Sequence, residues 1–178
     1  MRKQLEELRV QMKKHNIDIY IVPTTDYHGS EYVNDYFKCR EYLSGFTGSA
    51  GTLAVTQDTA ALWTDGRYFL QAEDELKDSE IVLYRAGMEG VPSVFEMIER
   101  ELPKGGRLFF DGSVVNAVTA DKLRDLIRNC AVICKKYCLI CRYRRKSIYN
   151  RKMSDIRTSD IEQPVYIIKC ADNMHIRT

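Results

Sequence analysis

The sequence lacks any apolar run that approaches the roughly 20 residues of a membrane-spanning helix. Residues 1–15, MRKQLEELRVQMKKH, are charged throughout and contain no apolar segment typical of a secretory signal peptide. We therefore expect a cytoplasmic protein with no membrane partner. The 178 residues, 44% of them hydrophobic and 29% charged, are enough for one globular domain but too few for that domain and a second, catalytic one.

Histidine is scarce, and its copies show no spacing typical of metal ligands. The three histidines are His15, His28 and His175. We expect His15 at the end of an exposed helix, and His28 lies in the polar loop PTTDYHGS without a paired histidine. The histidines therefore predict no metal site.

Phosphate-binding motifs are also missing, although Gly45, Gly48 and Gly51 recur at three-residue intervals in SGFTGSAG. This loop has neither the Gly-Lys-Ser/Thr ending of a P-loop nor the spacing of a dinucleotide fingerprint. Ser49 does not fit the pattern G-x-S-x-G, because Thr47 occupies the first glycine position. We expect these glycines to adopt positive φ angles and to allow a close backbone approach before the next strand.

Cysteine and negative charge are unevenly distributed along the chain. Residues 1–127 contain one cysteine, with 15 Lys+Arg and 21 Asp+Glu, whereas residues 128–178 contain five cysteines, with 12 Lys+Arg and 4 Asp+Glu. The basic run RYRRK at 142–146 is of a kind that contacts phosphates, but no nucleic-acid recognition motif accompanies it, so we expect no nucleic-acid partner. These changes indicate a domain over residues 1–141 and a basic, divergent tail or partial linker over residues 142–178.

The cysteine cluster supports one alternative function. Cys134, Cys138 and Cys141 have the spacing with which radical S-adenosylmethionine enzymes hold an iron–sulfur cluster. Those enzymes need a large barrel after the motif, and only 37 residues follow Cys141. A zinc site with Cys130 or Cys170 as a further ligand has poor spacing. A metal or iron–sulfur protein is therefore the weaker alternative, and we expect free thiols in a reducing cytoplasm.

Apolar periodicity predicts alternating helices and short buried strands. Two apolar runs separated by residues 57–59 indicate an antiparallel hairpin. The pattern favours an α/β fold with a mixed, roughly six-stranded sheet and helices on both faces. Helices are predicted over 2–15, 68–76, 93–101 and around 123–127, and strands over 17–22, 52–56, 60–64, 81–85, 107–110 and 131–134.

The most specific segment is residues 40–71, REYLSGFTGSAGTLAVTQDTAALWTDGRYFLQ. It resembles the N-terminal domain of cytosolic Xaa-Pro aminopeptidases (aminopeptidase P), members of the creatinase/prolidase superfamily, whose segment also reads SGFTGSAGT, a short apolar strand, then ALWTDGRYFLQA. The resemblance covers roughly residues 1–140 and implies a mixed sheet of about six strands flanked by helices. After Tyr137 it ends, and we interpret the remainder as a divergent or out-of-frame end.

The resemblance implies a non-catalytic role. In the family, a C-terminal domain binds a pair of metal ions, usually manganese, through two Asp, one His and two Glu, and cleaves the bond before proline. This chain has no matching ligand set, so we expect no cofactor in it and no activity from it alone. The implied role is assembly and substrate access, with a catalytic domain of the family or a second copy of the chain as partner. A stand-alone interaction module is the other alternative.

Four residues are candidates for a domain contact or for the rim of a substrate pocket. The resemblance implies this role because the family's N-terminal domains pack beside the catalytic domain and help to shape its pocket. The candidates are His28, Arg40, Asp65 and Arg67. From the residues alone we expect Asp65 to cap the helix that follows Gly66, and Trp63 to fill the core.

Overall fold

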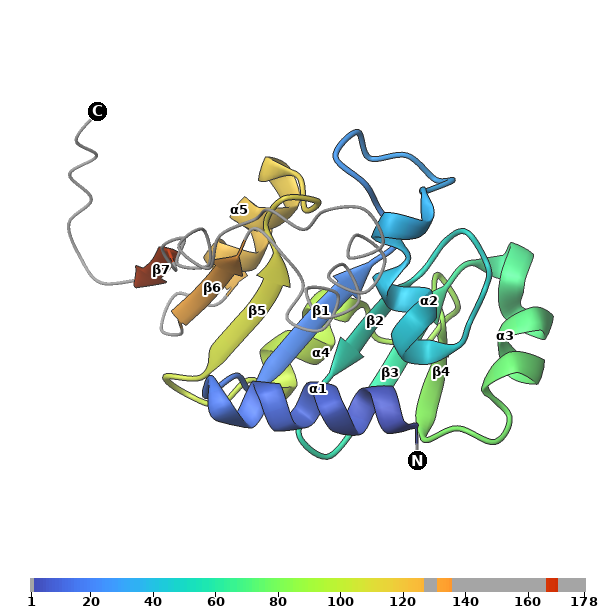
Figure 1. The fold of residues 1–178 in the computed structure, drawn as a ribbon, viewed down its shortest axis with the longest axis horizontal. Helices are drawn as coiled ribbons and strands as arrows, with labels where there is room; N and C mark the ends of the chain where they lie inside the picture. The colour runs from blue at the N-terminus through green and yellow to red at the C-terminus, as the bar shows by residue number, and fades with distance from the viewer. Residues whose placement is uncertain (1, 127–130, 136–165, 170–178) are drawn as a thin grey trace, which may run out of the picture.

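A mixed β-sheet forms the centre of the fold in the computed structural model, which describes residues 2–126, 131–135 and 166–169 (Figure 1). The strand order is β4-β3-β2-β1-β5-β6-β7. The strands are β1 (Ile19–Pro23), β2 (Thr52–Val55), β3 (Ala60–Thr64), β4 (Ile81–Arg85), β5 (Arg107–Asp111), β6 (Ala131–Lys135) and β7 (Tyr166–Lys169).

Most strands run in one direction. β1 is parallel to β5, β5 to β6 and β3 to β4, whereas β2 is antiparallel to both β1 and β3, and β7 is antiparallel to β6. The carboxyl ends of β1, β3, β4, β5 and β6 therefore lie at the same edge of the sheet. This carboxyl edge is where side chains from separate loops can meet.

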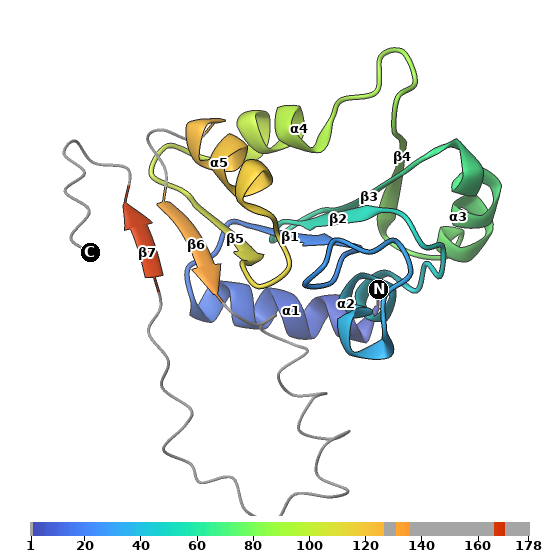
Figure 2. The same cartoon turned by 90° about the horizontal axis from the view of Figure 1, so that it is seen from above.

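Helices cover both faces of the sheet (Figure 2). One face carries α1 (Lys3–Lys14), α2 (Cys39–Ser44) and α3 (Phe69–Leu76), and the other carries α4 (Val94–Glu101) and α5 (Ala117–Leu126). Two short 3-10 helices, η1 (Asp35–Phe37) and η2 (Gly66–Tyr68), precede α2 and α3. None of the helices in the described part of the chain has the length and apolar character needed to cross a bilayer.

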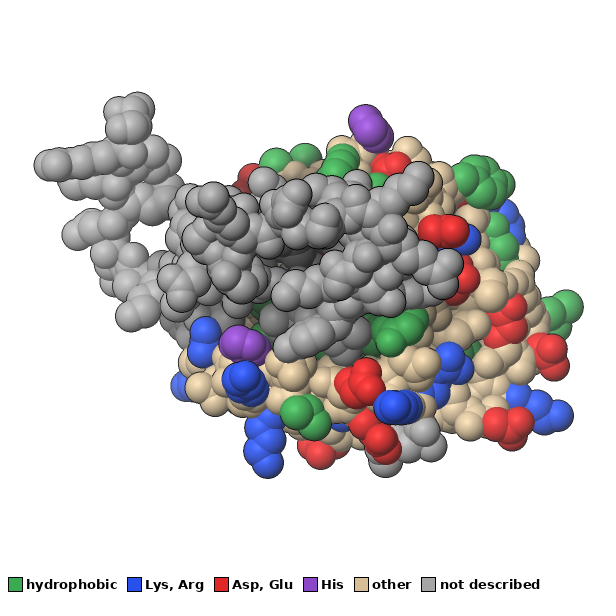
Figure 3. Space-filling model, viewed as in Figure 1, with side chains coloured by type: hydrophobic (Ala, Val, Ile, Leu, Met, Phe, Trp, Pro, Cys, Tyr) green, Lys and Arg blue, Asp and Glu red, His purple; other side chains and the backbone are tan. Residues whose placement is uncertain are grey.

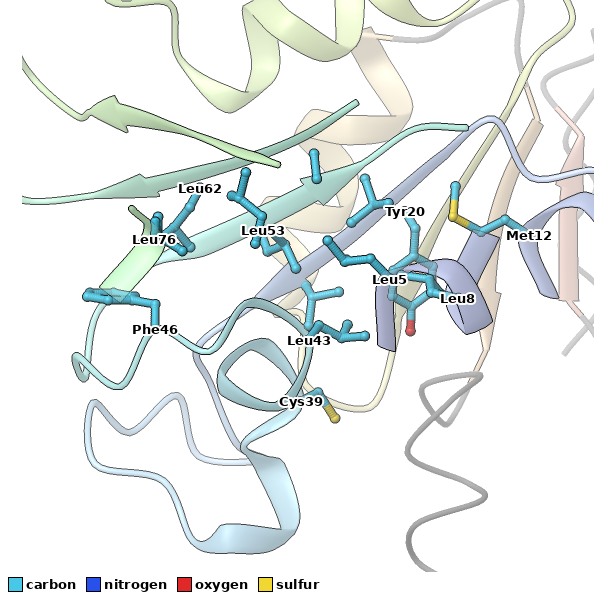
Figure 4. Packing of buried hydrophobic residues seen from close by; sticks show 14 of the residues in the cluster. Leu5, Leu8, Met12, Tyr20, Cys39, Leu43, Phe46, Leu53, Leu62 and Leu76 are labelled. Carbon is cyan, nitrogen blue, oxygen red and sulfur yellow. The ribbon is translucent and has the colours of Figure 1, made fainter. Parts of the chain in front are cut away.

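Alternating side chains divide the interior into two cores, because successive strand residues point to opposite faces. Tyr20, Leu53 and Leu62 face α1, α2 and α3 (Figure 4). In this core Tyr20 stacks on Phe109 with ring centroids 4.9 Å apart. Trp63 faces α4 and α5 from the opposite side of β3 and is buried, as predicted. Full burial of each large apolar side chain contributes about 1.5–3 kcal/mol to the stability of the fold. The two cores contain the apolar residues that recur periodically in the sequence.

The predicted α/β class, mixed sheet and hairpin are confirmed. The hairpin strand β2 ends at Val55 rather than 56, because Thr56 belongs to the turn, where its N–H donates to the carbonyl of Thr59 at 2.9 Å. The antiparallel pairs include β1–β2 and β6–β7 as well as the hairpin. The seventh strand, β7, was not predicted. It comes from an apolar stretch of the basic segment 142–178, and the division at residue 141 stays a prediction.

Candidate functional site

Two hollows open at the carboxyl edge of the sheet. Hollow 1, of about 400 Å³, lies between the segment 24–41 and the start of α3. Hollow 2, of about 730 Å³, lies on the α4 side, where Trp63 and residues 91–96 form one wall. Thr24, Glu31 and Ser49 line both hollows, so these three residues form the boundary between them.

Arg40 lies at the floor of hollow 1 and is 97% buried, with a relative exposure of 3%. Its Nε donates to Thr24 Oγ1 at 2.8 Å, its Nη1 donates to the carbonyl of Phe46 at 2.6 Å, and its Nη2 donates to the carbonyl of Gly48. All three acceptors are neutral oxygens. Burial lowers the pKa of Arg40 to about 10, so the guanidinium stays charged at neutral pH.

Asp65 and Arg67 are brought together at the border of hollow 2. Asp65 Oδ1 accepts the backbone N–H of Arg67 at 3.0 Å, which caps η2 as the sequence predicts. The Arg67 guanidinium donates to Asp65 Oδ2 at 2.8 Å and to Glu31 Oε1 at 2.7 Å. Hydrogen bonds to Asp65 and then Glu31 raise the pKa of Arg67, while the bond from Arg67 lowers the pKa of Asp65.

Glu31 connects this pair to the glycine loop. Its Oε1 accepts the hydroxyl of Ser49 at 2.8 Å, and Ser49 Oγ lies 2.6 Å from Tyr68 Oη. The hydrogen bonds from Ser49 and then Arg67 lower the pKa of Glu31. Through Glu31, the segment that follows β1 is tied to the glycine loop and to η2. We call Glu31, Ser49, Asp65, Arg67 and Tyr68 the boundary network.

His28 stands apart from these contacts. It is exposed, and its backbone N–H donates to Asp26 Oδ1 at 2.8 Å. Its neighbours Gly29 and Ser30 line hollow 2, whereas His28 lines neither hollow. The structure therefore joins Asp65 to Arg67, places Arg40 in the adjacent hollow, and leaves His28 on the loop surface. A role for these four residues in a domain contact stays a prediction.

The glycine loop departs in part from the expectation of positive φ angles. Gly45 has φ 76° and ends α2, but Gly48 and Gly51 do not have positive φ. A Cβ on Gly48 would collide with the Phe46 ring, and one on Gly51 would lie 3.0 Å from the carbonyl of Trp63. Gly48 and Gly51 thus provide the predicted close approach, and only Gly45 provides the left-handed turn.

The described residues do not fit a metal pair. Among them, no group of three His, Cys, Asp or Glu side chains is placed to hold a metal ion. Of the predicted cysteine cluster, the structure describes only Cys134, which lies in β6. Cys138 and Cys141 lie outside the described residues. The weaker alternative of a metal or iron–sulfur site there stays a prediction, as does the role of the basic run 142–146.

Sequence analysis missed Glu31, Ser49 and Tyr68 as members of the site. Ser49 and Tyr68 lie inside the segment 40–71, which the sequence singles out as the most specific. The sequence does not show that their hydroxyls pair with each other. Glu31 lies 36 positions from Arg67, and no local pattern connects the two. Only the return of separate loops to the same edge of the sheet brings them into contact.

A mixed sheet with helices on both faces is the fold of creatinase/prolidase N-terminal domains. The family model "Creatinase/Prolidase N-terminal domain" matches residues 4–139. Because this match covers most of the chain, the chain belongs to the creatinase/prolidase N-terminal domain family.

The curated relatives are aminopeptidases many times longer than the match. Aminopeptidase P2 of Arabidopsis thaliana is 51% identical over 111 residues, which are 62% of this chain and 16% of the relative. Probable Xaa-Pro aminopeptidase P of Talaromyces marneffei is 45% identical over 124 residues, 70% of this chain and 19% of the relative. The chain therefore spans less than a fifth of the length of these relatives.

Solved structures show the same fold. The X-prolyl aminopeptidase of Caenorhabditis elegans, described as a cytosolic enzyme with a di-nuclear active site, superposes with a TM-score of 0.74 at 29% identity, over 79% of this chain and 25% of that one. The N-terminal domain of the cytoplasmic peptidase PepQ of Mycobacterium tuberculosis superposes with a TM-score of 0.53 at 27% identity, over 75% of this chain and 93% of that one.

Proposed function

We propose that the chain is a non-catalytic N-terminal domain of an Xaa-Pro aminopeptidase, which contributes to assembly and to substrate access. The reaction served is the release of an N-terminal residue from peptides with proline in second position. The observation that carries this proposal is the 51% identity to a segment that makes up only 16% of Aminopeptidase P2. Its partner would be a catalytic region of the same family, or a second copy of the chain.

The chemistry of the described site supports a non-catalytic role for this domain, with catalysis assigned to a separate region. The boundary network consists of internally paired ions and hydroxyls, so its charged groups are engaged with one another. The worm relative is described as having a di-nuclear active site, and the described residues here supply no comparable ligand set. In our proposal a pair of metal ions, manganese by resemblance, belongs to the catalytic region and supplies the activated water. A cytoplasmic location agrees with the description of the worm enzyme as cytosolic.

A pair of assays tests the proposal. The purified 178-residue chain, with manganese added, is expected to release no N-terminal residue from an Xaa-Pro peptide, with full-length Aminopeptidase P2 as positive control. A chimera in which residues 4–139 replace the similar segment of Aminopeptidase P2 is expected to retain cleavage. A deletion variant of the relative without that segment is the comparison.

Two results would contradict this function. Cleavage by the chain alone would show that it is catalytic, and a chimera no more active than the deletion variant would remove its role in access or assembly. Metal bound to the chain at near-stoichiometric amounts and lost on Cys138→Ser would favour the metal-protein alternative instead.

A further inference from the structure

We infer that the aromatic rim of hollow 1 is the surface on which this domain contacts the catalytic region of an aminopeptidase P chain. The aromatic rim is defined by Tyr32, Phe37 and Tyr68, together with the apolar Val33 beside Tyr32. The inference rests on the proposed function and adds to it the location of the contact.

Exposed apolar side chains gather at the carboxyl edge of the sheet. Among the described residues, seven large apolar side chains are more than half exposed. Five of them follow the carboxyl end of a parallel strand: Tyr27, Tyr32, Leu70, Met88 and Val118. The other two, Val10 and Val82, lie on α1 and on the edge strand β4. Since these strand ends share one edge, five of the seven exposed large apolar side chains among the described residues lie on segments that leave this edge.

Tyr32 is the strongest anchor candidate on this edge. The residue is 81% exposed and borders a hollow of about 400 Å³. Behind it, Phe37 packs edge-on against Tyr27 and Tyr36, with ring centroids 4.7 and 4.8 Å apart. An exposed tyrosine beside a hollow, supported by further rings, is the composition that interface hot spots favour.

The boundary network holds this surface in one arrangement. Glu31, next to Tyr32 in sequence, is bound by Arg67 at 2.7 Å and by Ser49 at 2.8 Å, and Ser49 reaches Tyr68 of the rim at 2.6 Å. The segment that follows β1 is thereby fixed to η2. A surface that is already ordered loses less conformational entropy on binding.

Glu31, Lys38 and Glu41 line hollow 1 beside the aromatic rim, and this mixed polar and apolar character favours a covalently joined partner over a second copy. On the coloured part of the face in Figure 3, apolar side chains stand among acidic and basic ones. A stable dimer commonly buries about 1,200–2,000 Å² in total. In the relatives, a matched segment of 16% or 19% is part of the same chain as the rest, so a smaller contact suffices at that high effective concentration.

Amide hydrogen exchange tests the location of the contact. The intact 178-residue chain is compared with the chimera that carries residues 4–139 in Aminopeptidase P2. We expect exchange across residues 24–38 to slow at least about tenfold in the chimera, equivalent to about 1.4 kcal/mol, and exchange across residues 81–85 to stay unchanged. Tyr32→Ala in the chimera should abolish most of the slowing, whereas Val82→Ala, a matched change of an exposed apolar residue, should not.

Each outcome separates the contact from the function. An active chimera with unchanged exchange across residues 24–38 would overturn the contact while sustaining the proposed function. An inactive chimera with slowed exchange across residues 24–38 would sustain the contact and overturn the proposed function. Slowing that appears in the isolated chain as its concentration rises, and that Tyr32→Ala removes, would assign the rim to a second copy and overturn the inference.

Discussion

Arg40 is a charged side chain in the interior, and the surrounding carbonyl groups explain its position. A guanidinium carries five N–H donors, and burial without acceptors would cost several kcal/mol. The carbonyls of Phe46 and Gly48 and the hydroxyl of Thr24 accept three of its bonds. The Phe46 ring also lies 4.7 Å from Arg40 Cζ. Arg40 therefore connects α2, the end of β1 and the glycine loop.

Replacing this side chain should destabilise the domain strongly. Arg40→Met keeps much of the length but leaves the carbonyls of Phe46 and Gly48 without their donors. We expect a loss of about 3 kcal/mol in the free energy of unfolding, measured by urea denaturation. Lys38→Met is the matched control, because its ion pairs with Asp35 and Glu41 are at the surface, and it should change stability by less than about 1 kcal/mol. Equal effects would refute the structural role of Arg40.

Residue roles were predictable where they depend on neighbours in sequence. Asp65 was predicted as a cap because its acceptor and the N–H of Arg67 are two positions apart. Arg40 could be marked as a candidate, but its burial could not be foreseen, because its acceptors belong to a loop whose path the sequence does not show. The same limit applies to Gly48. Glycine is required there because a Cβ would collide with the Phe46 ring, and not because of a positive φ.

Among the elements, α4 has the best-defined start. The hydroxyl of Ser93 accepts the N–H of Glu96 at 3.2 Å, and Glu96 Oε2 accepts the N–H of Ser93 at 2.7 Å, which completes a capping box. This reciprocal pair satisfies two backbone donors that a helix otherwise leaves free. It fixes the start of α4, which carries Met97 and Ile98 into the second core.

Removing the cap should weaken the domain measurably. Ser93→Ala is expected to lower the free energy of unfolding by about 1 kcal/mol, because the N–H of Glu96 loses its acceptor. Glu99→Ala, at an exposed position of the same helix, should leave stability within about 0.5 kcal/mol. Thermal unfolding followed by circular dichroism compares the two variants. A loss for Glu99→Ala as large as that for Ser93→Ala would contradict the capping argument.

Long periodic elements could be predicted, whereas short ones could not. The strands β1 to β5 and the helix α1 show apolar spacing over enough residues to be recognised. The six-residue α2 was missed, because fewer than two turns give too few apolar repeats to indicate a helix. β7 was missed because its four residues stand alone in a basic segment, and strand pairing with β6 depends on contacts distant in sequence.

At the scale of the whole molecule, the loops at the carboxyl edge are held by carboxylates. Glu31 joins the segment after β1 to the glycine loop and η2, and Glu75 of α3 accepts from the N–H of Thr47 at 2.8 Å and from its hydroxyl at 2.6 Å. Burial alone would raise the pKa of Glu75, but the hydrogen bonds from Thr47 and Gln71 lower it. These connections span 18 to 36 positions, so sequence patterns cannot reveal them.

Acid should therefore loosen the domain. Asp26, Glu31, Asp65, Glu75 and Glu96 all have a lowered pKa in the folded chain, each through hydrogen bonds to the carboxylate. The unfolded chain thus binds protons at a higher pH than the folded one. The stability that these groups provide is complete above their unfolded pKa values, near 4, and is lost as pH falls through the folded values. We expect the urea midpoint to fall steadily between pH 5 and about pH 3.

Glu75→Gln separates this linkage from general acid denaturation. The amide cannot ionise, so the variant should be less stable than the parent at pH 7, and its urea midpoint should depend less on pH between 5 and 3. Asp74→Asn, at an exposed neighbouring position of α3, is the matched control and should follow the parent at every pH. If Glu75→Gln retained the full pH dependence of the parent, the hydrogen bonds from Thr47 would not be a source of acid sensitivity. The glycine loop would then need another anchor at the carboxyl edge.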